Sequence, residues 1–228
     1  MPDVTYTYQR IVKGTNVDID FWRQRWESNN IAFHKSEANP VLVSYFEALA
    51  LAKGSLVFVP LCGKTLDIAW LLAQGYRVAG AELIEIAIQQ LFGELDVTPQ
   101  ILEMGEVKHY SAENIDIFVG DIFQVSSEML GSVDAIYDRA ALVALPGEVR
   151  DRYTAHLRQM TNRAPQLLVT YEYDQTMMSG PPFSISLEEV QRHYGDRYAV
   201  SQLESTELPG GFRGKCAARE TVWLLKRH

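Results

Sequence analysis

Short apolar runs alternate with helical stretches through the middle of the chain, and this alternation constrains the fold more than any single motif. The first run, Leu56–Val59, is followed by a loop with one glycine and then by apolar residues at helical spacing. Further runs of this kind lie at Arg77–Ala81, Ile115–Val119, Val133–Tyr137 and Leu167–Tyr171. Strands that alternate with helices form a mostly parallel sheet with helices on both faces. We therefore predict an α/β fold.

The segments on either side of this alternation complete the predicted domain. Residues 1–17 are polar and without periodicity, which indicates a flexible N-terminal lead-in. Residues 18–29 carry aromatic side chains at helical spacing. The pair Asn39-Pro40 has the pattern of a helix start, and the apolar stripe that follows it ends near Gly54.

The C-terminal half contains one interruption and one change of pattern. Residues 98–114 separate two apolar runs and are predicted to be a loop. Two late strands, Tyr198–Leu203 and Thr221–Leu225, lie close together in the sequence, which favours an antiparallel end to the sheet. We expect residues 18–228 to form a single domain.

Bulk composition excludes several classes of partner. The formal net charge of −8 disfavours nucleic acid and anionic membrane surfaces. No apolar run approaches the length of a membrane helix, and the N-terminus lacks the pattern of a signal peptide. Cys62 and Cys216 form no disulfide framework, and no cysteine or histidine spacing indicates a metal site. We predict a cytoplasmic protein without a metal.

Special residues follow the predicted strands at the points where ligands of such sheets bind. Gly63 lies in the loop after the first strand, and Glu82 ends the second, about 20 residues further on. An acid at that position accepts hydrogen bonds from a ribose diol. Asp121, after the third strand, is placed to position an adenine ring together with Ile122. Asp138-Arg139 follows the fourth strand.

This pattern predicts a nucleoside-bearing cofactor, either a nicotinamide dinucleotide or S-adenosylmethionine. A dinucleotide needs a glycine-rich turn so that its pyrophosphate can approach the backbone. The loop Pro60-Leu-Cys-Gly63-Lys64 has a single glycine and also lacks the upstream glycine of a phosphate-binding loop. S-adenosylmethionine has no phosphate, so methyl transfer is favoured over hydride transfer and over nucleotide hydrolysis.

Six short motifs follow one another along the chain. They are Phe21-Trp-x-x-x-Trp26, Ala32-Phe-His34, Pro60-Leu-Cys-Gly-Lys64, Gly80-x-Glu-Leu83, Tyr137-Asp-Arg-Ala-Ala-Leu142-Val-Ala-Leu-Pro146 and Gly180-Pro-Pro-Phe183. In their order and spacing they resemble the thiopurine S-methyltransferase family, especially its bacterial branch. The resemblance covers about residues 18–225. It implies a Rossmann-like class I methyltransferase fold with S-adenosylmethionine as cofactor. The implied sheet has seven strands, is mostly parallel, and ends in an antiparallel strand.

The resemblance also implies roles for individual residues. Trp26 would pack on the cofactor, Leu61 would contact it through its backbone, and Arg139 would lie beside both cofactor and substrate. With the strand-end residues, the expected cofactor-binding set is Trp26, Phe33, Leu61, Gly63, Glu82, Asp121, Ile122 and Arg139. Trp22, in contrast, is interpreted as a packing anchor of its helix.

The acceptor side is predicted from the same motifs. Arg139 is the candidate to favour an anionic acceptor, and Asp138 is its candidate orienting partner. Candidate substrate contacts are His34, Phe183 and Arg213. A thiolate is a strong nucleophile, and aromatic thiols ionise readily, so these residues need not include a general base.

The predicted function is methyl transfer to the sulfur of aromatic or heterocyclic thiols such as thiopurines, by a monomeric enzyme. The family resemblance extends this to selenium or tellurium compounds. Three alternatives remain open at this point. They are a halide or thiol methyltransferase of the same fold, a nicotinamide oxidoreductase, and a non-catalytic module that only binds S-adenosylmethionine.

Overall fold

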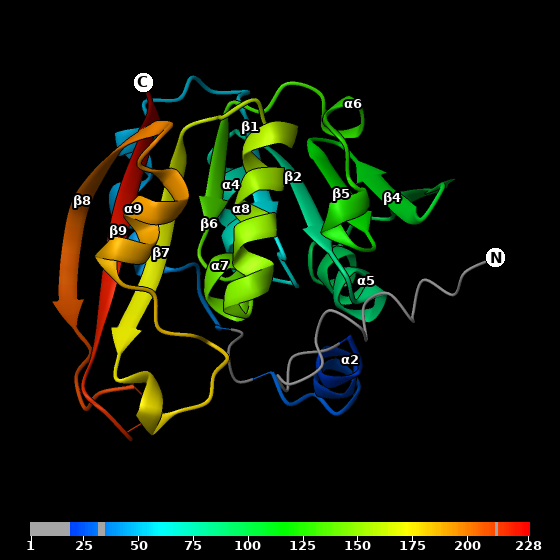
Figure 1. Cartoon of the computed structure of the whole chain (residues 1–228). Coiled ribbons are helices and arrows are strands. Elements are labelled where there is room, and N and C mark those ends of the chain that lie inside the picture. The colour runs from blue at the N-terminus through cyan, green and yellow to red at the C-terminus, as the bar shows by residue number, and fades with distance from the viewer. Residues whose placement is uncertain (1–18, 32–34, 213) are drawn as a thin grey trace.

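Nine strands form one sheet in the computed structural model, which describes residues 19–31, 35–212 and 214–228. Their spatial order is β3-β4-β5-β2-β1-β6-β7-β9-β8 (Figure 1). The strands are β1 (Leu56–Pro60), β2 (Arg77–Glu82), β3 (Gln100–Met104), β4 (Val107–Ala112), β5 (Ile115–Val119), β6 (Ala135–Asp138), β7 (Gln166–Tyr173), β8 (Tyr198–Glu207) and β9 (Ala218–Arg227).

Helices connect these strands and cover both faces of the sheet. The α-helices are α2 (Ile19–Glu27), α3 (Pro40–Tyr45), α4 (Leu66–Ala73), α5 (Glu85–Glu94), α6 (Ser127–Leu130), α7 (Ala141–Ala144), α8 (Gly147–Met160) and α9 (Leu187–Tyr194). The 3-10 helices are η1 (Phe46–Leu49), η2 (Ile122–Gln124) and η3 (Gln175–Met177). No helix in the described parts of the chain has the length and apolar character needed to cross a membrane.

The centre of the sheet is parallel, as predicted. Strands β5, β2, β1, β6 and β7 are parallel neighbours. Strand β9 is antiparallel to both β7 and β8, which confirms the predicted antiparallel end. The core follows from alternation along the strands, since successive side chains point to opposite faces. Thus Phe58 of β1 packs with α7, α8 and α9 on one face, and Val57 packs with α3, α4 and α5 on the other.

The predicted number of seven strands is wrong, because residues 98–114 are not a loop. They form the hairpin β3–β4 at one edge of the sheet, with Gly105 at positive φ in the turn. Strand β3 lies at the edge and exposes Ile101 and Leu102, two adjacent apolar residues. The hairpin therefore lacks the alternation by which a half-buried strand is recognised.

The helix that begins at Pro40 also ends earlier than predicted. Its α-helical part stops at Tyr45, and η1 continues it to Leu49. Ala50 then has φ 54°, which turns the chain well before Gly54. Asn39 caps the start as expected, since its side chain accepts a hydrogen bond from the Val41 backbone.

The functional edge of the sheet is the one at which the parallel strands end. Figure 1 shows β2 and β7 pointing toward this edge and α2 lying beyond it. Loops after β1, β2, β5 and β6 therefore meet beneath a helix from the N-terminal region. This is the arrangement in which open α/β sheets bind their ligands.

Candidate active site

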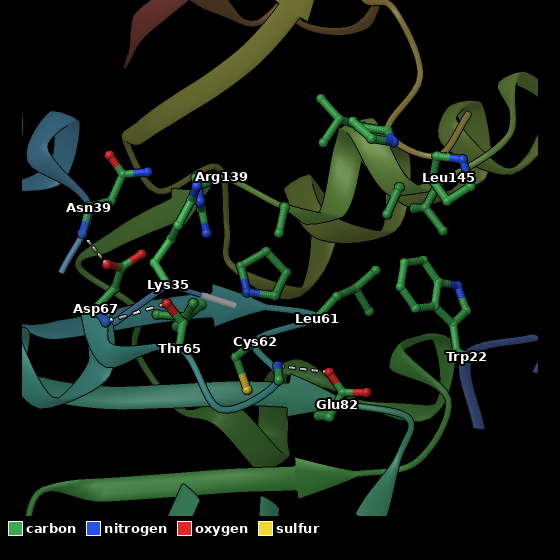
Figure 2. Close-up of a pocket in the computed structure, with 18 of the residues that line it drawn as sticks. Trp22, Lys35, Asn39, Leu61, Cys62, Thr65, Asp67, Glu82, Arg139 and Leu145 are labelled. Carbon is green, nitrogen blue, oxygen red and sulfur yellow. Dashed lines mark hydrogen bonds between the residues drawn. The ribbon is translucent and has the colours of Figure 1, made fainter. Parts of the chain in front are cut away.

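A cavity of about 630 Å³ lies at the carboxyl ends of the parallel strands. Its wall combines the loop after β1, the ends of β2 and β6, helix α2, and the segments around residues 181–182 and 208–212. Figure 2 shows Glu82 and Trp22 on one side of this cavity, with Arg139, Asn39 and Asp67 on the other. Of the strand-end residues that the sequence singled out, Gly63, Glu82, Asp121 and Arg139 thus face one shared space.

The loop after β1 is held in an unusual backbone conformation. Leu61 has φ 46° and Gly63 has φ 51°, both in the left-handed region. A non-glycine residue there costs on the order of 1–2 kcal/mol, so the surrounding structure must stabilise the turn. The Cys62 amide donates to the Ala81 carbonyl at 3.0 Å. Thr65 then caps α4 by accepting from the Asp67 amide.

Glu82 fixes this loop from the neighbouring strand. One carboxylate oxygen accepts from the Gly63 amide at 2.8 Å, and the other accepts from the Ile84 amide at 2.9 Å. Burial raises the pKa of Glu82, and the backbone donors partly offset that effect. Each carboxylate oxygen retains a further acceptor site. The buried group is therefore suited to hydroxyl donors, such as the two of a ribose.

Two tryptophans from α2 cover the same side of the cavity. Trp26 is 5% exposed. It lies so close to Gly63 that a side chain added there would meet the Trp26 ring at 3.0 Å. Trp22 also lines the cavity. It also packs against the buried cluster of Trp26, Ile84 and Ala87, as expected for a packing anchor, so Trp22 anchors its helix and faces the site as well.

The loop after β5 contributes Asp121 and Ile122 to the cavity wall. The Asp121 carboxylate accepts from the Phe123 amide at 3.0 Å and caps η2. His156 contacts the Ile122 carbonyl from α8 at 2.9 Å. These contacts fix the loop, and the predicted role of both residues beside an adenine ring remains a prediction.

Arg139 stands at the opposite side of the cavity among polar side chains from three elements. Burial alone would lower its pKa, but Tyr171, Tyr137, Asp67 and Glu220 raise the pKa above its ordinary value. The guanidinium therefore stays charged. A fixed cation in a half-buried wall is a binding group for an anionic or polarised ligand atom.

Asp67 connects the part of the cavity wall around Arg139 to α3, the α-helix that precedes β1. Its carboxylate accepts hydrogen bonds from the Asn39 backbone N–H at 2.7 Å and from the Tyr137 hydroxyl at 3.1 Å. Asp67 is only 2% exposed, so both contacts compensate a buried charge. Asp67 therefore connects the start of α3 and the first turn of α4 to the end of β6, and Arg139 is the residue that follows β6.

The prediction that Asp138 orients Arg139 is corrected by the geometry. Its carboxylate accepts from the Ala141 and Leu142 amides at 3.0 and 3.2 Å, and from the Tyr153 hydroxyl at 2.7 Å. Side chains alternate along a strand, so neighbours at its end point to opposite faces. Asp138 is fully buried beneath α7 and α8, away from the cavity.

Phe183 is likewise not a pocket wall in the described structure. Its amide donates to the Val143 carbonyl at 2.6 Å, and the Arg150 guanidinium lies 5.7 Å from the centre of its ring. Pro181 and Pro182, immediately before it, line the cavity instead. Phe183 therefore anchors the segment that carries these two prolines.

Three predicted site residues, Phe33, His34 and Arg213, lie outside the described residues. Within the described ranges, no group of three or more His, Cys, Asp or Glu side chains is placed to hold a metal ion. Cys62 lines the cavity, and burial raises its pKa well above the ordinary value, followed by the charge of Glu82. Its thiol is therefore a poor nucleophile.

Sequence comparison assigns the chain to a family. The family model described as Thiopurine S-methyltransferase matches residues 17–228. The chain belongs to the thiopurine S-methyltransferase family. Among its curated members, the protein from Xanthobacter autotrophicus is 53% identical over 209 residues, which are 91% of this chain and 98% of that protein. The protein from Teredinibacter turnerae is 51% identical, over 91% of this chain and 97% of that protein.

Solved structures confirm the fold class of this thiopurine S-methyltransferase family member. A SAM-dependent methyltransferase from Anabaena variabilis has a TM-score of 0.60 at 16% identity, covering 94% of this chain and 97% of that chain. The 1,6-didemethyltoxoflavin-N1-methyltransferase of Burkholderia thailandensis, solved with S-adenosylhomocysteine, has a TM-score of 0.63 at 13% identity. It covers 98% of this chain and 91% of that chain.

Several cavity residues of this family member were missed from sequence. Tyr171 ends the predicted fifth strand, and Glu220 directly precedes the predicted last strand. An antiparallel strand begins at the edge where its parallel neighbour ends, so this pair carried a usable signal. Asp67 carried a weaker one, because an acid in the first turn of a helix is usually explained by the helix dipole.

Proposed function

We propose that this chain transfers a methyl group from S-adenosylmethionine to the sulfur of a small aromatic or heterocyclic thiol, such as a thiopurine. One observation carries the proposal. In a member of this family, a single cavity has a buried carboxylate, Glu82, on one side and a fixed cation, Arg139, on the other. The first suits the nucleoside of the donor, and the second suits the acceptor.

The residues present fit S-adenosylmethionine better than a dinucleotide. Glu82 keeps acceptor sites for a ribose diol, whereas a pyrophosphate beside it would face a like charge. Lys64, the cation of the loop, is bound to Glu94 at 2.6 Å. Trp26 and the positive-φ residues Leu61 and Gly63 would complete the donor site. When bound, S-adenosylmethionine supplies a methyl group activated by attachment to a positively charged sulfur.

The chain's own residues then have two tasks, alignment and exclusion of water. Methyl transfer is an in-line displacement, and holding both reactants in position supplies much of the rate. Arg139 stabilises negative charge on the acceptor sulfur from a fixed position. Trp22, with Pro181 and Pro182, covers the cavity from outside the sheet and limits the access of water.

Purified protein with methyl-labelled S-adenosylmethionine tests the proposal. We expect methylation of a thiopurine and of an aromatic thiol by the wild type. For Arg139→Ala we expect a large loss of thiol turnover with cofactor binding, measured by calorimetry, largely kept. A wild type that binds the cofactor but methylates no thiol would be a binding module. A wild type that does not bind the cofactor would refute the proposal.

The remaining alternatives are separated by changing one component at a time. A halide methyltransferase would prefer iodide over thiopurine as acceptor. A nicotinamide oxidoreductase would bind the dinucleotide more tightly than S-adenosylmethionine in a parallel titration. Activity on selenium or tellurium compounds, a cytoplasmic location and a monomeric state stay predictions from the sequence.

A further inference from the structure

Tyr171 and Glu220 form a cross-strand pair in the acceptor side of the cavity. They are directly opposite each other in the antiparallel register of β7 and β9. Residues opposite in this way present their side chains on the same face of the sheet. Both residues line the cavity and both are half-buried.

The pair is coupled to Arg139. Burial, followed by the charge of Glu220, raises the pKa of the Tyr171 phenol, while the charge of Arg139 lowers it. Glu220 and Tyr171 also raise the pKa of Arg139. The guanidinium, the phenol and the carboxylate therefore lie within electrostatic reach of one another at the side of the cavity opposite Glu82.

Methylation of a neutral thiol or thione requires that a proton leave the acceptor. Arg139 is permanently charged and cannot take it. Among the described residues that line the cavity there is no histidine, and the four carboxylates are Asp67, Glu82, Asp121 and Glu220.

Three of these carboxylates are committed elsewhere. Both oxygens of Asp67 accept protein hydrogen bonds, from the Asn39 amide and the Tyr137 hydroxyl. Glu82 binds two backbone amides on the other side of the cavity. Asp121 caps η2. Glu220 also has a hydrogen-bond partner, the Tyr171 phenol, but this donor leaves acceptor sites on its two oxygens. Glu220 is thus the carboxylate on the acceptor side that can still take a proton from the cavity.

We propose that Glu220 is the catalytic base that accepts the proton of the acceptor thiol, and that Tyr171 is a positioning residue for its carboxylate. This inference rests on the proposed function. The acceptor sulfur forms a bond to the methyl carbon, and the bond from that carbon to the donor sulfur breaks, leaving its electron pair on the donor. The acceptor's proton passes to the Glu220 carboxylate and from there to solvent, because Glu220 is half-exposed.

The groups that face Glu220 set the conditions under which it acts. Tyr171 approaches from β7 and Arg139 from the end of β6, and Asp67 in turn acts on Arg139 from α4. On its other side, Thr206 of β8 is the directly opposite residue and carries no charge. Lys35 also lines the cavity and is exposed.

Acceptors of graded acidity test the assignment. A nitro-substituted aromatic thiol is already ionised in neutral buffer, whereas a benzylic thiol is not. We expect Glu220→Gln to lower kcat/KM for the benzylic thiol by about 100-fold or more, the usual contribution of a general base. For the ionised thiol we expect little change. Raising the pH restores Glu220→Gln on the benzylic thiol, because the acceptor then ionises in solution.

Two readouts do not depend on turnover. Calorimetry is expected to give the same affinity for S-adenosylmethionine in the wild type and in Glu220→Gln. Without methyl donor, the absorbance of a bound aromatic thiol of intermediate acidity reports its ionisation. We expect the thiolate band in the variant to be at least as large as in the wild type, because the Glu220 carboxylate disfavours a second negative charge beside it. The loss of turnover then reflects proton removal during the reaction and not a weaker stabilisation of the bound thiolate.

Glu172→Gln is the matched control, because Glu172 is the exposed neighbour of Tyr171 on the same strand. It removes the same charge but faces away from the cavity, and we expect it to behave as wild type. Tyr171→Phe is expected to give a smaller loss than Glu220→Gln, again confined to the weakly acidic acceptor.

Equal losses on both acceptors would overturn the assignment of Glu220 as a base, and so would no loss on either. If Glu220→Gln does not fold, Glu220→Asp replaces it, because moving the carboxylate back by one methylene is expected to slow the same acceptor selectively. A wild type inactive on all thiols would refute the proposed function itself. If the wild type is active and Glu220→Gln loses the same turnover on the ionised and the benzylic thiol, only the role of Glu220 is refuted.

Discussion

Replacing Asp138 with asparagine measures how much the protonation of one buried carboxyl group contributes to the free energy of unfolding. Asp138 is fully buried and accepts hydrogen bonds from the Ala141 and Leu142 amides and from the Tyr153 hydroxyl. An asparagine carbonyl can accept the two amide bonds. Its NH₂ group then faces the Tyr153 hydroxyl, which can rotate to accept. The variant therefore keeps the shape and the bonds but has no charge to titrate.

The magnitude follows from the pKa of the carboxyl. Burial raises the pKa of Asp138 from an ordinary 3.8 to about 6, despite hydrogen bonds that lower it. Each unit of pKa difference between folded and unfolded states is worth about 1.4 kcal/mol, so the total is about 3 kcal/mol. Because the folded state binds the proton more tightly, the stabilisation is complete below pH 3.8 and is lost as the pH rises through about 6.

Urea unfolding at a series of pH values checks this result. The free energy of unfolding of the wild type, relative to Asp138→Asn, is expected to fall by about 3 kcal/mol from about pH 3 to about pH 7. Glu113→Gln, which removes one carboxylate at an exposed position between β4 and β5, controls for net charge. A difference that does not change with pH would refute the reasoning, and so would one that rises.

Three further substitutions test the walls of the cavity. Glu82→Gln places an NH₂ group against a backbone N–H and removes a charged hydrogen-bond acceptor, whose bonds are worth about 1.5–3 kcal/mol. Calorimetry is therefore expected to show that the Kd for S-adenosylmethionine rises about 10- to 100-fold. Gly63→Ala puts a methyl group 3.0 Å from the Trp26 ring at a positive φ, so thermal unfolding is expected to show a loss of about 1–2 kcal/mol. Arg139→Lys keeps the charge but not the planar donor geometry, so thiol turnover is expected to stay well below wild type. Wild-type turnover would contradict this, because charge alone would then be sufficient.

The parallel centre of the sheet was predictable because its strands are buried on both faces. Such strands read as continuous apolar runs, and Ile115–Val119 has the predicted bounds of β5. The hairpin of residues 100–112 was missed for the opposite reason. Its outer strand lies at the edge and leaves Ile101 and Leu102 exposed, so burial does not impose a pattern on it.

A cavity residue was predictable where its position at the end of a strand is enough to place it in the site, as for Glu82. It was not predictable where side-chain direction decides the role. Asp138 and Arg139 are adjacent in sequence, yet Asp138 is buried under α7 and Arg139 faces the cavity. For Glu220 the usable signal reaches only as far as the edge of the sheet at which its strand begins. The face that its side chain takes depends on the register between two strands about 50 residues apart.

The position of β9 has a consequence for the order in which this protein is assembled. Strand β8 precedes β9 in the sequence, but its neighbour in the sheet is β9, which separates it from β7. Strand β8 therefore has no partner in the sheet until β9 is available to pair with it. Its backbone donors and acceptors stay unpaired until β9 joins it to β7. The acceptor wall forms in that same late step, so the nascent chain can hold the donor-side loop before it has a complete active site.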